Sequence, residues 1–132
     1  MSIPLLCIAL LAILCLALGF NVSMTRAKTM TAFGSKDDPT CPLYKAQRAH
    51  GNTIEYAPIL AIVFYVLGQS QSADWVNWTM ILVTFCRYLL ALGLLLPATM
   101  AKPNPMRFIG ALGTYIGGLV LSVVLLLTAL NV

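Results

Sequence analysis

Three polar side chains, Arg48, Asn52 and Glu55, carry the chemistry most readily recognised in this sequence. They lie in the stretch RAHGNTIEYAP, immediately before the apolar run ILAIVFYVLG. At about 100° per residue they share one face of a helix, with Tyr56 beside that face and His50 nearly opposite. An arginine, an amide and a carboxylate aligned in this way could bind a polar ligand that carries charges of both signs.

Glu55 needs a partner if this helix crosses a membrane. A charge at the centre of a spanning helix costs at least ~2.5–3.5 kcal/mol. Arg87, in the apolar stretch FCRYLLALGLLL, is the expected partner. One hypothesis is an ion pair of Glu55 and Arg87 that only fixes helix packing, with Asn52 bonded to a neighbouring helix. The other is a polar site reached from the cytoplasmic side, which also explains Arg48 and Asn52 and which we favour.

The composition indicates a membrane protein. The chain has 132 residues, of which 60% are hydrophobic and 9% charged, and its mean hydropathy is +0.90. Soluble domains carry about 25% charged residues. The net charge of +4 comes without a basic cluster, so no nucleic-acid partner is expected. The cysteines show no ligand spacing and there is a single histidine, so no metal site is expected.

Four segments are long and apolar enough to span a bilayer, which takes roughly 20 residues each. They cover about residues 3–24, 46–68, 76–96 and 106–130 of a single domain, 1–132. The first lacks a basic region before it and is interpreted as a retained span. The sequence therefore predicts an all-α, four-helix integral membrane bundle.

Lysine and arginine collect in the first and third connections and not in the second, QSQSAD. The positive-inside rule places those two connections in the cytoplasm and both termini outside it. The short loops suggest a bacterial cytoplasmic (inner) membrane. Glycines at 110, 113, 117 and 118 have the small-xxx-small spacing of close helix packing, but glycine is also simply common in membrane helices.

The stretch RAHGNTIEYAP resembles the hallmark of the MAPEG family, the membrane-associated proteins of eicosanoid and glutathione metabolism, and the chain looks like a bacterial-type member. The family pattern is filled by Arg48, His50, Asn52, Glu55 and Pro58. The resemblance extends over nearly the whole chain. It implies a left-handed four-helix bundle that forms a homotrimer, with glutathione bound between subunits near the cytoplasmic face.

The resemblance also implies roles for individual residues. Glutathione would be bound by Arg26, Arg48, Asn52, Glu55, Tyr56 and Arg87. Arg107, near the start of the fourth helix, would activate the thiol. The chain departs from the family pattern at Leu90 and Leu92, where many members carry His and Tyr, and at Ala111, where some carry Tyr.

The function implied is glutathione-dependent transferase or peroxidase activity on a small lipophilic electrophile that arrives from the lipid. The alternatives are a non-enzymatic membrane protein that binds a lipid or a partner protein, and a structural membrane subunit.

Overall fold

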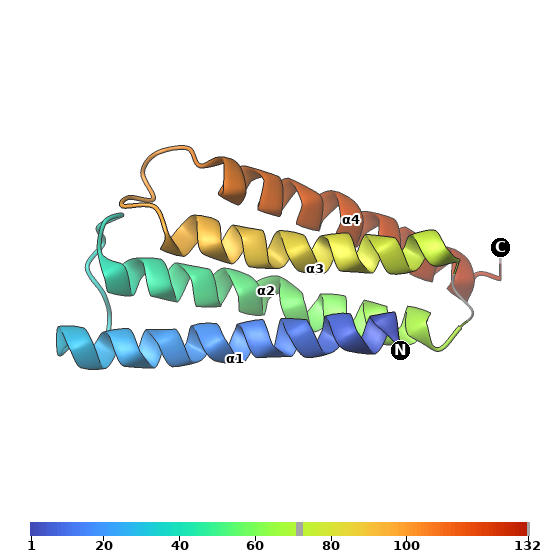
Figure 1. Ribbon diagram of the computed structural model, residues 1–132, viewed down its shortest axis with the longest axis horizontal. Coiled ribbons are helices and arrows are strands. Elements are labelled where there is room, and N and C mark those ends of the chain that lie inside the picture. Colours follow the sequence, from blue (N-terminus) through green and yellow to red (C-terminus); the bar gives the residue numbers. More distant parts are fainter. Residues whose placement is uncertain (71–72, 132) are drawn as a thin grey trace.

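Four long helices make up the molecule, of which the computed structural model describes residues 1–70 and 73–131. They are α1 (Ile3–Thr29), α2 (Pro42–Gly68), α3 (Asp74–Leu95) and α4 (Pro105–Ala129). All four are long and apolar enough to cross a membrane, and Figure 1 shows them side by side in one bundle. The predicted all-α four-helix membrane bundle is confirmed.

Proline marks the start of three of these helices. Pro4, Pro42 and Pro105 lie in the first turns of α1, α2 and α4, where the missing N–H costs nothing. Asn104 caps α4 by accepting a hydrogen bond from the backbone N–H of Arg107 at 3.1 Å. Pro58 lies inside α2, which continues through it without a break, as membrane helices often allow.

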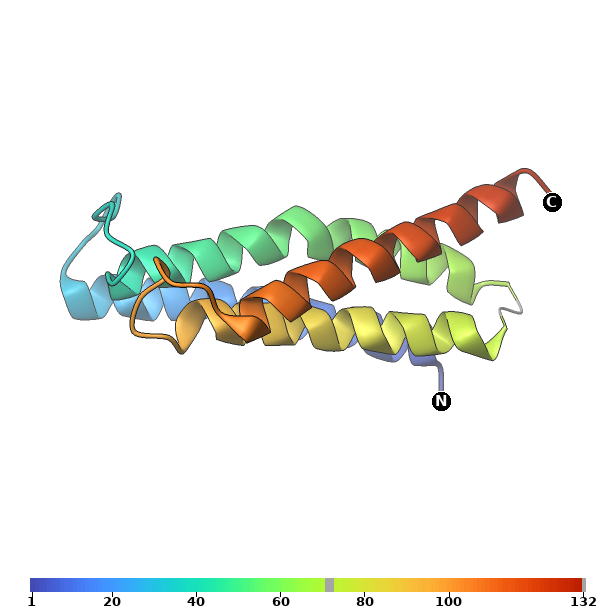
Figure 2. The same ribbon diagram turned by 90° about the horizontal axis from the view of Figure 1, so that it is seen from above.

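The bundle consists of two antiparallel helix pairs. α1 packs most extensively on α2, and α3 on α4, while α3 also contacts α1 and α2. Between α1 and α4 no two described Cα atoms lie within 8 Å. α4 crosses α3 obliquely and reaches over toward α2 (Figure 2). A space bounded by α2, α3 and α4 therefore opens on the side away from α1.

The outer surface is apolar along the helices. Leu16, Phe20, Phe108 and Leu119 are each more than two-thirds exposed, and a soluble protein rarely displays so large an apolar surface. In contrast, α3 is the most buried helix. The chain is a multi-pass integral membrane protein whose helices present aliphatic and aromatic side chains on their outer surface.

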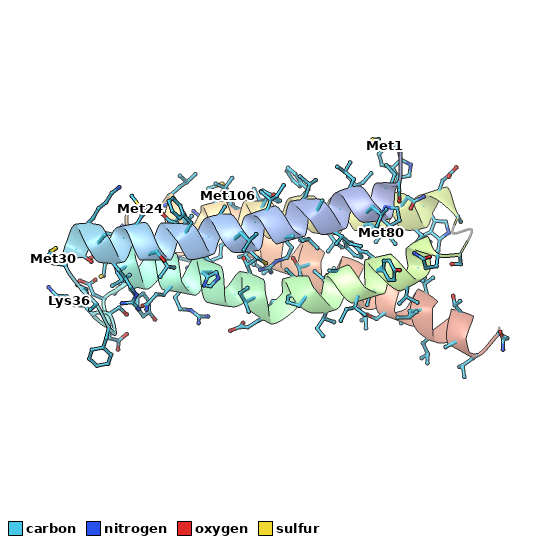
Figure 3. All side chains as sticks on the ribbon, turned by 90° about the horizontal axis from the view of Figure 1, so that it is seen from below. Met1, Met24, Met30, Lys36, Met80 and Met106 are labelled. Atoms are coloured by element: carbon cyan, nitrogen blue, oxygen red, sulfur yellow. The ribbon has the colours of Figure 1, made fainter. Side chains whose placement is uncertain are left out.

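Both basic connections lie at one end of the bundle, and both termini lie at the other (Figure 1). Met30 and Lys36 lie at the first end, far from Met1 (Figure 3). The backbone N–H of Met100 donates to the carbonyl of Pro39 at 3.0 Å and joins the two connections. Lys45 also reaches across, donating to the carbonyls of Leu95 and Pro97 at 3.4 and 2.8 Å.

Candidate functional site

Three helices direct polar side chains into one cavity of about 280 Å³, here called the arginine cavity. Its lining combines cations, hydrogen-bonding groups and apolar walls. These residues are Arg48, Asn52, Arg87, Leu90, Leu94, Met100, Arg107, Ala111, Thr114 and Tyr115. Four of the seven residues that the family resemblance pointed to thus meet in a single chain.

Arg87 is the most deeply buried of the cations, with an exposed fraction of 1%. Its Nη2 donates to the backbone carbonyl of Asn52 at 3.0 Å and to Asn52 Oδ1 at 2.8 Å, with a longer contact of 3.5 Å to Thr53 Oγ1. The Tyr56 ring lies beneath the guanidinium, 5.1 Å from Cζ to the ring centroid. Arg87 Nε has no hydrogen-bond partner among the described residues.

The expected ion pair of Glu55 and Arg87 is not formed, so that part of the packing hypothesis is wrong. Its other part is confirmed, because Asn52 bonds a neighbouring helix by accepting from Arg87 of α3. Glu55 is exposed on the outer face of α2, while the Arg87 guanidinium is held by neutral acceptors one turn earlier. An arginine charge is therefore buried without a carboxylate beside it. Since no acidic residue lines the arginine cavity, the cavity is strongly electropositive.

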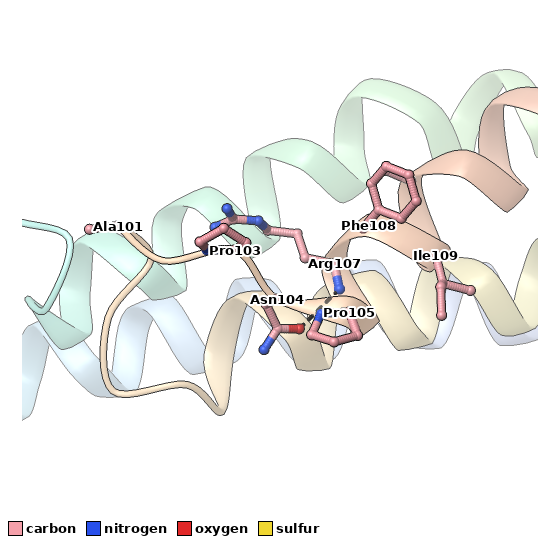
Figure 4. A pocket seen from close by; sticks show the side chains of 8 residues that line it. Ala101, Pro103, Asn104, Pro105, Arg107, Phe108 and Ile109 are labelled. Atoms are coloured by element: carbon pink, nitrogen blue, oxygen red, sulfur yellow. Dashed lines mark hydrogen bonds between the residues drawn. The ribbon is translucent and has the colours of Figure 1, made fainter.

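Arg107 lies at the start of α4, where the Asn104 cap fixes the first turn. Its Nη1 donates to the carbonyl of Met100 at 2.9 Å, and its side chain runs back along the connection toward Pro103 (Figure 4). A guanidinium has five N–H groups, so this bond leaves donors for a ligand.

A second, more open and mostly apolar cavity of about 950 Å³ adjoins the arginine cavity at Arg107 and Ala111. Its other lining residues come from the connection and the first turn of α4 (Figure 4): Ala101, Pro103, Asn104, Pro105, Phe108 and Ile109. Arg107 thus stands between an apolar opening and a polar interior.

Two other residues of the motifs lie away from the arginine cavity. Arg26 donates from Nη1 to the carbonyls of Thr31 and Gly34 at 3.1 and 3.0 Å, and so closes the turn after α1. His50 packs against Gly19 of α1, where a Cβ would lie 3.2 Å from His50 Nε2. His50 is therefore an interhelical packing residue.

Tyr56 and Tyr115 form a hydroxyl pair between α2 and α4. Their oxygens lie 3.1 Å apart, and their rings meet edge to face with centroids 5.7 Å apart. From the sequence alone, Tyr56 and Tyr115 could equally be packing residues with hydrogen-bonded hydroxyls, and Tyr115 was not among the predicted site residues. The sequence did contain a signal for Tyr115. Arg107, Ala111 and Tyr115 are spaced four residues apart, which keeps all three near one face of α4.

Tyr115 also borders a third space, here called the α2–α4 groove, of about 310 Å³. This groove is mainly apolar, with Glu55 and Ser122 among its polar lining residues. The lining residues are Glu55, Tyr56, Ile59, Leu60, Val63, Thr114, Tyr115, Gly118, Leu119 and Ser122. Glu55 and Tyr56 therefore lie next to the arginine cavity and not in its lining.

The departures from the family pattern differ in their consequence. Leu90 and Ala111 line the arginine cavity, so the groups absent there would have faced a ligand. Leu92 is 45% exposed and does not line it. The cavity thus depends on arginine, asparagine, threonine and tyrosine for its polar contacts.

Three arginines face this small cavity, and one of them, Arg87, is buried. Such a lining suits an anion, because guanidinium forks bind carboxylates with paired hydrogen bonds. The bundle and this cavity define a multi-pass membrane protein with an electropositive cavity at the end where its basic connections lie.

A family comparison agrees with the motif and the fold. The model of the MAPEG family matches residues 4–127, and the chain belongs to this family. Searches of curated proteins and of solved structures find no match.

Proposed function

We propose that this protein binds glutathione in the arginine cavity and directs its thiol at lipophilic electrophiles, as a glutathione-dependent transferase or peroxidase. The observation that carries the proposal is the meeting of Arg48, Arg87 and Arg107 with Asn52 around one cavity that has no acidic lining residue. Glutathione has two carboxylates and one ammonium, so its net charge suits this site.

The second-helix stripe supports the orientation of the tripeptide. Arg48 and Arg87 suit its carboxylates, and Asn52 offers an amide. Glu55, in the adjoining α2–α4 groove, is an acceptor for the ammonium. Near Arg107 the thiol would ionise more readily, because a neighbouring cation lowers a thiol pKa from its usual value of about 8.5.

We also propose that the protein is a homotrimer in which a neighbouring chain completes the site. Glu55 is exposed and makes no ion pair within 4 Å in the part of the chain described. A carboxylate at membrane depth needs a partner, and a ligand or a neighbouring subunit supplies one. Arg26, remote from the cavity of its own chain, could reach that of a neighbour. The protein mass in detergent micelles should equal three chains; a monomer would contradict this.

The proposed topology follows from the seven cations other than Arg87. Those in the two basic connections and the adjoining helix ends favour the cytoplasmic side, which would place both termini outside. They are Arg26, Lys28, Lys36, Lys45, Arg48, Lys102 and Arg107. A bacterial inner membrane fits the short connections.

Thiolate absorbance, titrated against pH with and without protein, tests the function. Bound glutathione should ionise at lower pH than free glutathione. Arg107→Ala should abolish the shift and spare most of the binding. Lys102→Ala is the matched control, because it also removes a positive charge from the connection before α4. The Lys102 side chain is exposed and lines none of the three spaces described above. This variant should therefore leave the shift in thiol ionisation unchanged.

A non-enzymatic ligand-binding protein is the second candidate. It is favoured by Leu90 and Ala111 in the cavity lining and by the bond that already engages Arg107 with Met100. Glutathione that binds the wild-type protein without a change in thiol ionisation would support this candidate and contradict the transferase. No glutathione binding at all would leave a membrane protein that binds a lipid or a partner protein, or a structural subunit.

A further inference from the structure

We infer that the Tyr56–Tyr115 hydroxyl pair is the polar contact for the lipophilic substrate, and that it selects electrophiles whose reacting group contains an oxygen atom. This inference rests on the proposed function and deepens it. It assigns the α2–α4 groove to the body of that substrate and places the reacting group at Tyr115.

The Tyr56–Tyr115 pair has one hydroxyl hydrogen more than its own hydrogen bond uses. Two hydroxyls hold two O–H donors, and the bond between Tyr56 and Tyr115 uses one of them. Neither hydroxyl has another partner in the part of the chain that the structure describes. Either hydroxyl can be the donor in this bond. When Tyr56 donates to Tyr115, the Tyr115 O–H remains free to donate to a group outside this pair.

The Tyr115 hydroxyl lies well inside the membrane-spanning part of α4. Tyr115 lies ten residues after Pro105, the first residue of α4, or about 15 Å along the helix at 1.5 Å per residue. Hydrocarbon at this level offers no acceptor, so an O–H facing it is unsatisfied. Tyr115 is 54% exposed, so a molecule entering from the lipid can reach it.

Tyr115 lies between the arginine cavity and the α2–α4 groove. It lines both the arginine cavity and the α2–α4 groove, as does Thr114. Ile59, Leu60, Val63 and Leu119 make the groove apolar, which suits an aliphatic or aromatic body. A substrate in the groove would present its reacting group at Tyr115, beside the cavity in which the thiol is proposed to lie.

The ring positions are fixed by their surroundings. The Tyr56 ring contacts both the Arg87 guanidinium and the Tyr115 ring. Arg87 is itself anchored by Asn52. The pair therefore belongs to a connected set of side chains from α2, α3 and α4, which fixes the positions of its two oxygens for a substrate.

An epoxide shows the chemistry. The thiolate sulfur forms a bond to one ring carbon while the bond from that carbon to oxygen breaks. The oxygen keeps the electron pair and takes up one proton, which balances the proton that the thiol released, and no oxidant or reductant is consumed. A hydroxyl donating to that oxygen is strongest as its negative charge develops, which accelerates the step.

The test compares two substrates of similar size, a long-chain terminal epoxide and a long-chain alkyl iodide, which has no oxygen. Tyr115→Phe keeps the ring and removes the donor. It should lower kcat/KM for the epoxide by about 10- to 100-fold, the effect of one hydrogen bond to a charged group. The alkyl iodide rate, measured with glutathione at saturation, should change by less than about twofold.

Tyr65→Phe is the matched control, because it is the same change on α2 nine residues beyond Tyr56, on the opposite side of the helix and outside the groove lining. It should affect neither substrate. Equal losses on both substrates with Tyr115→Phe, or no loss on the epoxide, would overturn the inference.

A second measurement does not need glutathione. The carbonyl stretch of a bound long-chain ketone should shift to lower frequency in the wild-type protein and return toward the unbonded value in Tyr115→Phe. If glutathione fails to bind, the transferase proposal fails while this band still reports on the hydroxyl pair. An identical band in both proteins would overturn the inference even where transferase activity is present.

Discussion

Arg87 is a charge buried in a membrane bundle with only neutral partners. Its contacts are the carbonyl and amide oxygens of Asn52, the Thr53 hydroxyl and the face of Tyr56. Asn52 therefore has two roles that compete for the same oxygens, holding Arg87 and facing a ligand. Arg87 Nε has no hydrogen-bond partner among the described residues, so the guanidinium is only partly satisfied by the protein.

We expect Arg87 and Asn52 to be energetically coupled. Asn52→Ala removes an acceptor from a charged donor and should destabilise the fold by about 1.5–3 kcal/mol, and Arg87→Met should cost less when Asn52 is already changed. A double-mutant cycle on unfolding in detergent measures the coupling, which should be about 0.5–3 kcal/mol.

Glu55→Gln combined with Arg87→Met is the control cycle and should be additive within about 0.5 kcal/mol, because the two side chains do not pair. Strong coupling in the control cycle would restore the Glu55–Arg87 ion pair that the structure lacks.

At the residue scale, the sequence predicted which side chains share the polar face of α2, but not which of them bonds Arg87. Helical periodicity placed Arg48, Asn52 and Glu55 on one side of α2 correctly relative to one another. It could not determine how α2 is rotated about its own axis against α3. A rotation of about 60°, the angle between Asn52 and Glu55 around the helix, decides which of them meets Arg87. Charge complementarity favoured Glu55, while the structure satisfies the arginine with an amide and a backbone carbonyl.

At the scale of elements, α4 approaches α3 through a line of glycines. A Cβ on Gly110 would lie 2.6 Å from the backbone nitrogen of Leu90, and one on Gly113 would overlap Cys86 Sγ. Gly117 meets Val83 in the same way. The small-residue spacing thus serves packing within one chain, and it gives no support to the expected trimer.

Gly113→Ala should destabilise the protein by about 1–3 kcal/mol, the usual cost of overpacking. Cys86→Ala in the same chain should recover most of this loss, because the obstructing atom is the Cys86 sulfur. Unfolding in detergent followed by circular dichroism measures both.

Gly51→Ala is the matched control for this substitution, since no atom lies within 4 Å of a Cβ there. It should be neutral or stabilise the helix by up to about 1 kcal/mol. If Cys86→Ala does not restore the stability lost in Gly113→Ala, the contact between Gly113 and Cys86 is not the cause of that loss.

Periodicity and hydropathy indicated four helices, since runs of this length are distinctive. They could not choose between α3 of the same chain and a helix of another chain as the partner of the glycine line, because both contacts need the same spacing. The first helix also continues to Thr29, beyond the apolar run, because polar residues such as Asn21 and Thr25 still form helix where the chain leaves the hydrocarbon.

At the scale of the whole molecule, the proposed topology can be read through Cys41, at the start of α2 in the first basic connection. The pKa of its thiol is lowered, chiefly by the backbone N–H of Tyr44 in the first turn of α2. A lowered pKa means more thiolate at a given pH than in a free cysteine, so reactivity should persist to lower pH.

A membrane-impermeant maleimide should therefore label Cys41 in inside-out vesicles and not in right-side-out vesicles. Cys7, Cys15 and Cys86 lie within the spans and should label slowly in both, and Cys41→Ser should remove the fast reaction. Fast labelling in right-side-out vesicles would reverse the orientation and place both termini in the cytoplasm.

The pairing of α1 with α2 and of α3 with α4 has a consequence for biogenesis. Each pair is a hairpin whose turn lies at the basic end, so each could enter the bilayer as a unit during translation. Until the hairpins associate, Arg87 on the second has no Asn52 to meet and faces lipid alone. Their association relieves that charge, which makes the late step of assembly directional and leaves an orphaned second hairpin recognisable to quality-control proteases.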